Sequence, residues 1–375
     1  MIYIIFLSFF IFAAFFDVKN NQFILKKVLA FFLVISAIIF FGLRYYTGAD
    51  WHDYIIYFNN VTWDDTRYQF GYKMLNIICK SVVNNYFFVQ FIASSIFICA
   101  ISKFFISYSR WSFVCIFLSL VLYFSTLFMA QVRQSLAIAI ILFGSKFLFE
   151  KKNILFVISV LIASLFHITA LFSLTLFFLK IPFSRRIRLI LFASSFILLK
   201  FPELIFLSIE SLGKVSKTIG SVSAHYLTGI FAKGAGVSSG VYFYAKCFLV
   251  LIILIFYKPK TVIDNFAMNA LVFSNFLNVG SLCFVIIERL ESYIGLYAIL
   301  GYVKFFEISF LSKNKNIFYM TFFLFILFFS LPFVKDRLST GINRNGRSAQ
   351  YQYIPYYNVF MHPENANLRK DWNEK

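Results

Sequence analysis

Residues 28–54 read VLAFFLVISAIIFFGLRYYTGADWHDY and change character halfway along. The run from Val28 to Leu43 is apolar, as expected of a helix that crosses a membrane. It ends in Arg44, which is followed by aromatic residues, Gly48, two aspartates and a histidine. Polar residues that gather where such a run ends predict a functional site at a membrane surface. The planar guanidinium of the arginine is suited to donate paired hydrogen bonds to a phosphate or a carboxylate. The alternative is an arginine that reaches the headgroups from within an aromatic belt.

The composition assigns the whole chain to the same class. Hydrophobic residues make up 61% and charged residues 14%, whereas a soluble globular protein is about half apolar. Long continuous apolar runs favour an all-α, polytopic membrane protein over a β-barrel, which needs short alternating segments. We therefore predict a membrane domain over residues 1–334 with about 11–12 transmembrane helices. The apolar runs are 2–16, 28–43, 86–108, 112–130, 134–149, 153–180, 187–201, 241–257, 265–287, 290–311 and 316–334.

The formal net charge of +19 does not indicate nucleic-acid binding, because the basic residues are scattered through short loops and the tail. Membrane topology and anionic lipid headgroups explain this charge, so membrane lipids are the expected partners. The five cysteines show no metal-ligand spacing and are interpreted as small core residues. We expect no metal and no cofactor.

Lysine and arginine clusters in short loops mark the cytoplasmic side of a membrane protein. The run 153–180 has such clusters at both ends, which predicts a short re-entrant hairpin with His167 near its tip; the alternative is one long tilted span. On the hairpin interpretation, one extracytoplasmic face carries the loops 44–85 and 202–240, the exits at Arg44, Arg133, His167 and Glu288-Arg289, and the tail 335–375.

Two further segments contain candidate site residues. Arg133 and Gln134 open a helix, where a cation is unfavourable unless an anion joins it; an arginine that reaches the headgroups is the alternative. Arg289 and Tyr293 lie one helical turn apart, behind Glu288, and the alternative there is a local ion pair. His167 is either a packed core histidine or a group that orients or deprotonates a hydroxyl.

The segment Arg44 to Asp50, followed by Tyr54, resembles the R-x-x-x-G-x-D-x-x-x-Y signature of the EpsG family, the Wzy-like polysaccharide polymerases of bacterial surface-glycan clusters. The resemblance continues in the same order along nearly the whole chain. Its further segments are Arg133 to Ala137, Leu165 to Ala170, Arg289 with Tyr293, and Ile354 to Tyr357.

The resemblance implies an O-antigen polymerase of the bacterial inner membrane with its active site facing the periplasm. Such an enzyme transfers a growing glycan from undecaprenyl pyrophosphate onto the non-reducing end of a lipid-linked repeat unit. These lipid-linked oligosaccharides are its substrates, and a chain-length regulator is a candidate partner. The expected substrate-binding residues are Arg44, Arg133, Arg289, Gln134, Tyr293 and Tyr45. The expected catalytic residues are His167, Asp50 and Glu288, of which the first two are candidate bases.

Other classes make different demands on the sequence. A flippase or other transporter is expected to show inverted repeats and charges on both faces, and we find neither. An O-antigen ligase shares the carrier chemistry but uses a different acceptor. A membrane O-acyltransferase presents a catalytic histidine in an early motif, and a purely structural protein has no reason to concentrate arginine, aspartate and histidine at helix exits.

Overall fold

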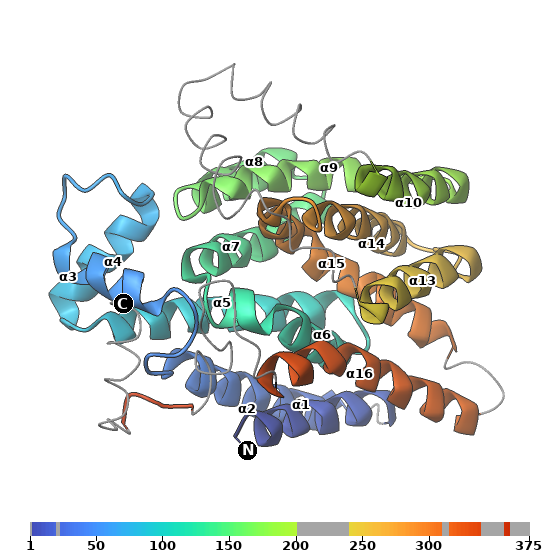
Figure 1. Cartoon of the computed structure of the whole chain (residues 1–375), viewed down its shortest axis with the longest axis horizontal. Helices are drawn as coiled ribbons and strands as arrows, with labels where there is room; N and C mark the ends of the chain where they lie inside the picture. The colour runs from blue at the N-terminus through green and yellow to red at the C-terminus, as the bar shows by residue number, and fades with distance from the viewer. Residues whose placement is uncertain (1, 20–22, 201–239, 310–314, 339–355, 361–375) are drawn as a thin grey trace. The chain divides into compact units, whose positions relative to one another are not determined.

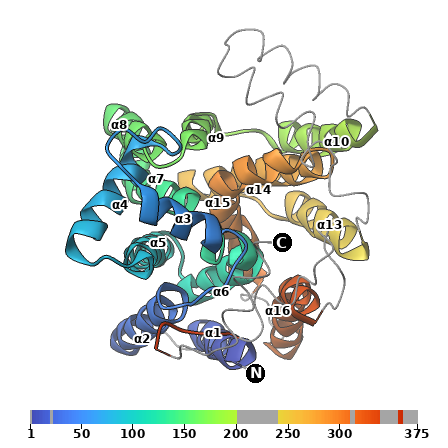
Figure 2. The same ribbon diagram turned by 60° about the vertical axis from the view of Figure 1, so that its left-hand side comes forward.

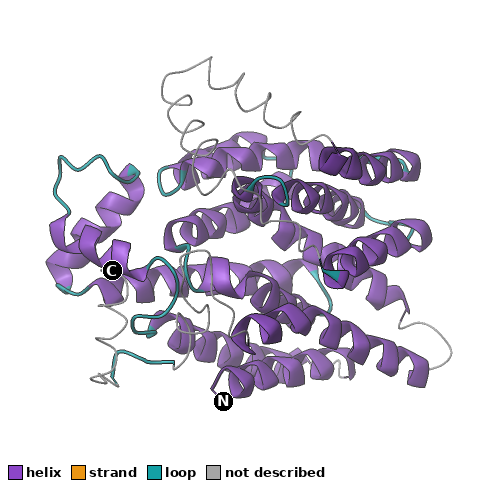
Figure 3. Cartoon of the chain, in the orientation of Figure 1, coloured by secondary structure: helices purple, strands orange, loops and turns teal. Residues whose placement is uncertain are grey.

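The computed structural model describes residues 2–19, 23–200, 240–309, 315–338 and 356–360 (Figure 1). Within these ranges the regular structure is entirely helical, and Figure 3 draws no strand. The predicted all-α class is therefore confirmed. Three helical segments are long and apolar enough to cross a membrane: Ile24–Gly42, Tyr86–Tyr108 and Val132–Phe149. Shorter apolar helices cover Ile2–Val18, Ser112–Phe128, Asn153–Ser164, Ile168–Leu179, Val241–Phe256 and Phe318–Leu331. These helices are those of a membrane protein.

The chain divides into two compact units. The first comprises residues 1–171 and 309–375, and the second comprises residues 172–308. Most candidate site residues belong to the first unit. Its helices are α1 (Ile2–Lys19), α2 (Phe23–Gly42), α3 (Trp51–Asn60), α4 (Phe70–Val82), α5 (Tyr86–Tyr108), α6 (Ser112–Tyr123), α7 (Val132–Phe149), α8 (Asn153–Ser164) and α16 (Lys315–Leu338), with a π-helical turn, η1 (Phe124–Phe128).

In the first unit, α5 packs against both α2 and α7, α7 packs against α8, and α6 packs against α1 and α16 (Figure 2). One end of this bundle, here called the Asp17 end, is tied together by a buried carboxylate. Asp17 accepts a hydrogen bond from Lys26 Nζ at 2.5 Å and another from the backbone N–H of Phe113 at 2.8 Å. A carboxylate at the first turn of α6 is favourable, because the N-terminal N–H groups of a helix lack partners within it.

The opposite end, here called the Arg44 end, gathers aromatic rings from both ends of the sequence. Tyr3 lies 5.6 Å from Phe40 and 5.8 Å from Phe124, measured between ring centroids. Phe333, near the end of α16, lies 4.8 Å from Phe124. The helix exits at Arg44 and Arg133 therefore share one end of the first unit with the C-terminal part of α16.

The predicted loop 44–85 is largely helical, because it contains α3 and α4. Asn85 caps the following helix α5, accepting a hydrogen bond from the N–H of Phe87 at 3.0 Å. Figure 1 shows α3 and α4 at the left of the first unit, beyond the ends of its long helices. The predicted loop 202–240 lies almost wholly outside the described residues. The predicted tail 335–375 starts within α16, which continues to Leu338, and most of the tail lies outside the described residues.

The apolar run 153–180 is not one continuous α-helix. Helix α8 ends at Ser164, the turn 165–167 follows, and the chain then forms a 3-10 helix, η2 (Ile168–Thr175), and the short α9 (Leu176–Leu179). The α-helix is therefore interrupted next to His167, where the hairpin interpretation places its tip. The hairpin and the single tilted span both stay predictions of the path through the membrane.

The second unit is built from α9, α10 (Arg185–Lys200), α13 (Val241–Phe256), α14 (Val262–Ser281) and α15 (Val285–Ser309). Buried Arg188 on α10 donates to the side chains of Asn265 and Asn269 on α14, both at 2.8 Å. Asn269 in turn donates to the backbone carbonyls of Leu179 and Ile181. This network joins α10 to α14 without a carboxylate.

Candidate active site at the Arg44 end

Arg44 is bound by the fold through both terminal nitrogens of its guanidinium, whereas its buried Nε has no hydrogen-bond partner among the described residues. Its side chain donates hydrogen bonds to the carbonyl of Phe41, to Ser94 Oγ at 3.3 Å and to the carbonyl of Met129 at 3.1 Å. The residue is 2% exposed, and this burial lowers the pKa of its guanidinium from the usual value. Because Phe41 lies in the last turn of α2, the cation sits at the negative end of a helix dipole, which is favourable.

The backbone conformation at Gly48 explains why the same motif has a glycine at this position. Its φ of +113° is a conformation that L side chains rarely adopt, and a Cβ placed there lies 2.4 Å from the carbonyl oxygen of Met129. The same carbonyl accepts from Arg44. Arg44 and Gly48 thus clamp the chain after α2 onto the turn between η1 and α7, and only glycine fits that approach.

The C-terminal segment completes the clamp. Arg44 and Asn358 form an antiparallel bridge, with backbone hydrogen bonds of 2.9 Å from Tyr45 N–H to the Tyr357 carbonyl and from Val359 N–H to the Leu43 carbonyl. The Tyr356 ring stacks on Phe40 at 4.6 Å, and its hydroxyl donates to the Phe40 carbonyl at 2.6 Å. Segments from opposite ends of the sequence therefore form one structure around Arg44.

Arg133 has very different surroundings. It lies in the first turn of α7, where the helix dipole is positive and a second positive charge is unfavourable. Its guanidinium lies 3.9 Å from the ring centroid of Tyr68, and Nη1 donates to Gln69 Oε1 at 3.1 Å. Among the described residues it forms no ion pair, and its buried Nε has no hydrogen-bond partner.

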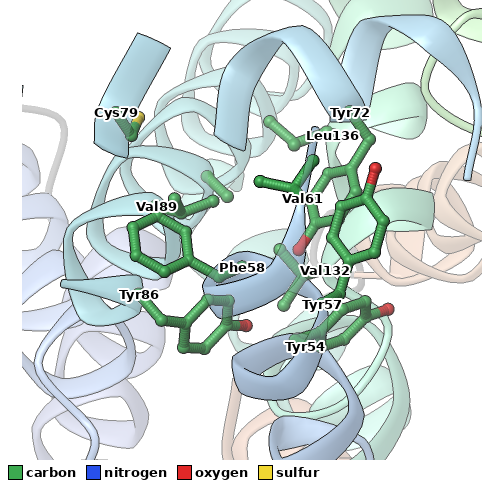
Figure 4. Close-up of a cluster of buried hydrophobic side chains, with 11 residues drawn as sticks. Tyr54, Tyr57, Phe58, Val61, Tyr72, Cys79, Tyr86, Val89, Val132 and Leu136 are labelled. Atoms are coloured by element: carbon green, nitrogen blue, oxygen red, sulfur yellow. The ribbon is translucent and has the colours of Figure 1, made fainter. Parts of the chain in front are cut away.

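Tyrosines surround this cation. Tyr54, Tyr57, Tyr68 and Tyr72 pack with ring centroids 4.4–6.2 Å apart. Figure 4 shows Tyr54, Tyr57 and Tyr72 in the same buried cluster as Val132 of α7. Burial raises the pKa of Tyr54 to about 12 although Arg133 beside its hydroxyl lowers it. Burial likewise raises the pKa of Tyr57 to about 12. These hydroxyls therefore stay neutral near pH 7 and do not act as bases.

Tyr45 and Asp50 lie on the loop between Arg44 and α3. The ring of Tyr45 stacks on Tyr46 at 4.0 Å, and Tyr46 stacks on Trp51 at 4.4 Å. Both tyrosines are partly exposed, so this ladder of rings presents aromatic surface at the Arg44 end. Asp50 precedes α3, and the negative charge of its carboxylate contributes to the raised pKa of Tyr54.

The N-terminus of α4 connects Arg133 with the turn that carries His167. Gln69 binds the arginine, and two residues later the N–H of Gly71 donates to the carbonyl of Leu165 at 2.7 Å. A Cβ on Gly71 lies 2.9 Å from that carbonyl oxygen, so the approach is tight. His167 follows two residues further on and is 8% exposed.

The remaining predicted residues are less accessible or belong elsewhere. Gln134 follows Arg133 and is 2% exposed. Glu288 and Arg289 lie at the start of α15 in the second unit, and Tyr293 is buried in that unit's core. Within the described ranges, histidine, cysteine, aspartate and glutamate side chains do not gather in groups of three or more that can hold a metal ion.

Three polar residues at the site were not anticipated. Gln69 binds Arg133, Ser94 accepts from Arg44, and Gln90 donates to the carbonyls of Gly42 and Arg44 at 3.1 and 2.7 Å. Gln90 and Ser94 lie one turn apart inside the apolar helix α5. Two polar residues at that spacing in a membrane span predict a polar partner on one face of the helix. The spacing of Gln90 and Ser94 is visible in the sequence and could have identified both residues.

Comparison with known proteins gives one family. The model of the EpsG family matches residues 27–358. This range begins just before the apolar run of α2 and ends at Asn358, the residue that bridges to Arg44. It therefore includes the side-chain contacts described above for Arg44 and Arg133, together with Gly48, Leu165 and their partners. No curated protein and no solved structure matches the chain.

Proposed function

The chain belongs to the EpsG family, and from this premise we propose that it is an O-antigen polymerase of the bacterial inner membrane. Family membership and the apolar helices support a membrane polysaccharide-polymerase role in general. In the reaction that we propose, an acceptor hydroxyl attacks the anomeric carbon of a glycan carried by undecaprenyl pyrophosphate. The bond to the pyrophosphate breaks, and the hydroxyl proton passes to a base.

The observation that carries this proposal is the contrast between two arginines. Arg44 donates hydrogen bonds to the carbonyls of Phe41, at the C-terminal end of α2, and of Met129, so backbone carbonyls of the fold already stabilise its charge. Neither arginine forms an ion pair among the described residues, but Arg133 lies at the positive end of α7 and so lacks the dipole stabilisation that Arg44 has. A helix N-terminus together with an arginine favours a bound anion. We propose that Arg133 binds the pyrophosphate and stabilises the charge that develops as it leaves.

Arg44 then has a positioning role. It anchors the loop that carries Tyr45 and Asp50, and its backbone pairs with the C-terminal segment 356–360. Asp50 and His167 are the candidate bases for the acceptor hydroxyl. Gln134, Arg289, Tyr293 and Glu288 stay predicted site residues. The partly exposed rings of Tyr45 and Tyr46 suit stacking against sugars.

The proposed orientation follows from the lysine and arginine residues near the Asp17 end. Basic residues lie in the helix turns and connections at this end of the unit. Lys26 and Lys27 are in the first turns of α2, Lys103 and Lys146 are near the C-terminal ends of α5 and α7, Arg110 follows α5, and Lys151 and Lys152 lie between α7 and α8. The positive-inside rule assigns such loops to the cytoplasm. The Arg44 end, with Arg133 and His167, then faces the periplasm, where we propose that polymerisation occurs.

The decisive experiment compares two arginines that face the same tyrosine ring. The purified protein is reconstituted in proteoliposomes with an undecaprenyl-pyrophosphate-linked repeat unit, and product chain length is measured. Removing the cation with Arg133→Ala is expected to lower the rate of polymer formation by roughly 100-fold, and Arg133→Lys to restore part of it.

Arg67→Ala is the matched control. Arg67 lies 5.2 Å from the Tyr68 centroid but is exposed and lies 3.6 Å from a carboxylate oxygen of Asp53. This variant is expected to keep the wild-type products. Equal activity of the two alanine variants would exclude Arg133 from the reaction.

Deleting the gene tests the reaction class itself. Loss of a polymerase leaves lipopolysaccharide with core plus a single repeat unit. Loss of a ligase or of a flippase leaves core with no repeat unit. The second result would replace the proposed polymerase with one of those two classes.

A further inference from the structure

Helix α4 is apolar on two opposite faces. Its inner face places Tyr72 and Cys79 in the buried cluster and also buries Asn76, each at most 2% exposed. Its outer face carries apolar residues at every fourth position, which lie along one side of a helix. These are Phe70, Met74, Ile78 and Val82, of which the first, third and last are 57%, 53% and 69% exposed. A helix that faces water normally has polar residues at such positions.

The two lysines of α4 do not make this outer stripe polar, because the fold uses both. Lys73 Nζ donates to the carbonyls of Trp63 and Asp65 at 2.8 and 3.0 Å. Lys80 Nζ donates to the carbonyls of Phe58 and Asn59, at the end of α3, at 3.1 and 2.7 Å. The outer stripe is thus left without a charge of its own.

The path of the chain indicates what this stripe meets. Helix α4 ends at Val82 and α5 begins at Tyr86, so at most about 14 Å of extended chain separates α4 from a membrane-spanning helix. Of the three residues between them, Val83 is apolar and 41% exposed, while Asn84 and Asn85 are polar. The loop before α4 exposes Trp63 at 62%, and tryptophan is enriched at the membrane-water boundary.

We propose that α4 lies in the membrane interface at the Arg44 end, with Phe70, Met74, Ile78 and Val82 inserted into the lipid leaflet. An interfacial helix places its apolar face at the boundary between headgroups and acyl chains. The partner is the bilayer surface itself, and this inference does not depend on the proposed polymerase activity. One consequence does rest on that activity. Because Gln69 precedes α4 and binds Arg133, insertion of α4 sets this cation at the depth of a lipid-linked pyrophosphate.

Spin labelling tests the proposal in vesicles of phosphatidylethanolamine and phosphatidylglycerol. Single cysteines replace Ile78 and Val82 in a full-length protein without its native cysteines, and each carries a nitroxide. Collision rates are measured with oxygen, which concentrates in lipid, and with a water-soluble nickel chelate. Ile39→Cys, at a 52% exposed position on α2, is the lipid reference. Thr66→Cys, at an exposed position before α4, is the water reference.

Oxygen access at both α4 positions comparable to Ile39, with little nickel access, is the expected result. Nickel access comparable to Thr66 would place the stripe in water and overturn the proposal. Low access to both reagents would show that protein covers the stripe and would also overturn it. A second measurement keeps the native cysteines: in Ile78→Trp, vesicles of brominated lipid are expected to quench the added fluorescence as strongly as in Ile39→Trp.

Discussion

At the scale of single residues, two arginines of the same predicted role differ in what the neighbouring helix dipole does to them. Arg44 lies at the carbonyl end of α2, and its charge is stabilised there. Arg133 lies in the first turn of α7, where its charge is destabilised. The first is therefore suited to holding the fold together, and the second to binding an anion.

Gly48 gives a prediction about backbone conformation. At φ +113°, with the Met129 carbonyl oxygen 2.4 Å from the position of a Cβ, alanine is both strained and in steric conflict. Gly48→Ala is expected to lower the free energy of unfolding by about 1–3 kcal/mol and to reduce polymer formation. Thermal unfolding in detergent measures the first effect. The control Ala49→Ser, at an exposed neighbouring position, is expected to behave as wild type, and a fully stable Gly48→Ala protein would contradict the clamp.

For the tyrosine cluster we predict a substitution that does not lower stability. Among the described residues the buried hydroxyl of Tyr57 has no hydrogen-bond partner, and an unsatisfied buried polar group is costly. Tyr57→Phe is therefore expected to leave the melting temperature unchanged or to raise it. Tyr356→Phe is the contrasting variant, because its hydroxyl donates to the Phe40 carbonyl at 2.6 Å. It is expected to lose about 1 kcal/mol, and a destabilised Tyr57→Phe would show that the hydroxyl is bound in the fold.

At the scale of elements, the C-terminal segment 356–360 is the described part of the first unit that local sequence explains least. It contains no long apolar run, yet its backbone pairs with residues 43–45 through an isolated antiparallel bridge. Two backbone hydrogen bonds of 2.9 Å and the stacking of Tyr356 on Phe40 bind this segment to the Arg44 end.

Two truncations measure what the segment 356–360 contributes to stability and activity. Ending the chain after Phe360 leaves the bridge to Arg44 and the stacking of Tyr356 intact. Ending it after Pro355 removes both. The shorter chain is expected to melt at a lower temperature and to make little polymer, while the longer one behaves as wild type. Equal melting temperatures of the two truncated proteins would show that the segment 356–360 is not needed for stability.

At the scale of the whole molecule, the distribution of basic residues predicts which end of the first unit faces outward. Asn59, at the Arg44 end, and Asn153, the first residue of α8 at the Asp17 end, are both exposed. In single-cysteine proteins, an impermeant maleimide applied to spheroplasts is expected to label Asn59→Cys directly. Asn153→Cys is expected to react only after permeabilisation. The reverse pattern would invert the topology and with it the proposed periplasmic site.

The sequence by itself determined the class of the protein and most of its helices, because both follow from local composition. The run 86–108 predicted α5 to the residue, and 241–257 predicted α13 to within one residue. Its motifs pointed to the EpsG family, which the family match confirms. Local periodicity was also enough to place Arg44 and Arg133 at helix ends.

Only the tertiary structure decided what those ends are bound to. Arg44 meets Met129, 85 residues away, and Asp17 meets Phe113, 96 residues away. The contact of the Tyr68 ring with Arg133 and the bridge between Arg44 and Asn358 likewise join segments that are far apart in the sequence. Such contacts depend on how helices pack in three dimensions. The pattern of apolar residues along one helix records which face is buried, but not which partner buries it.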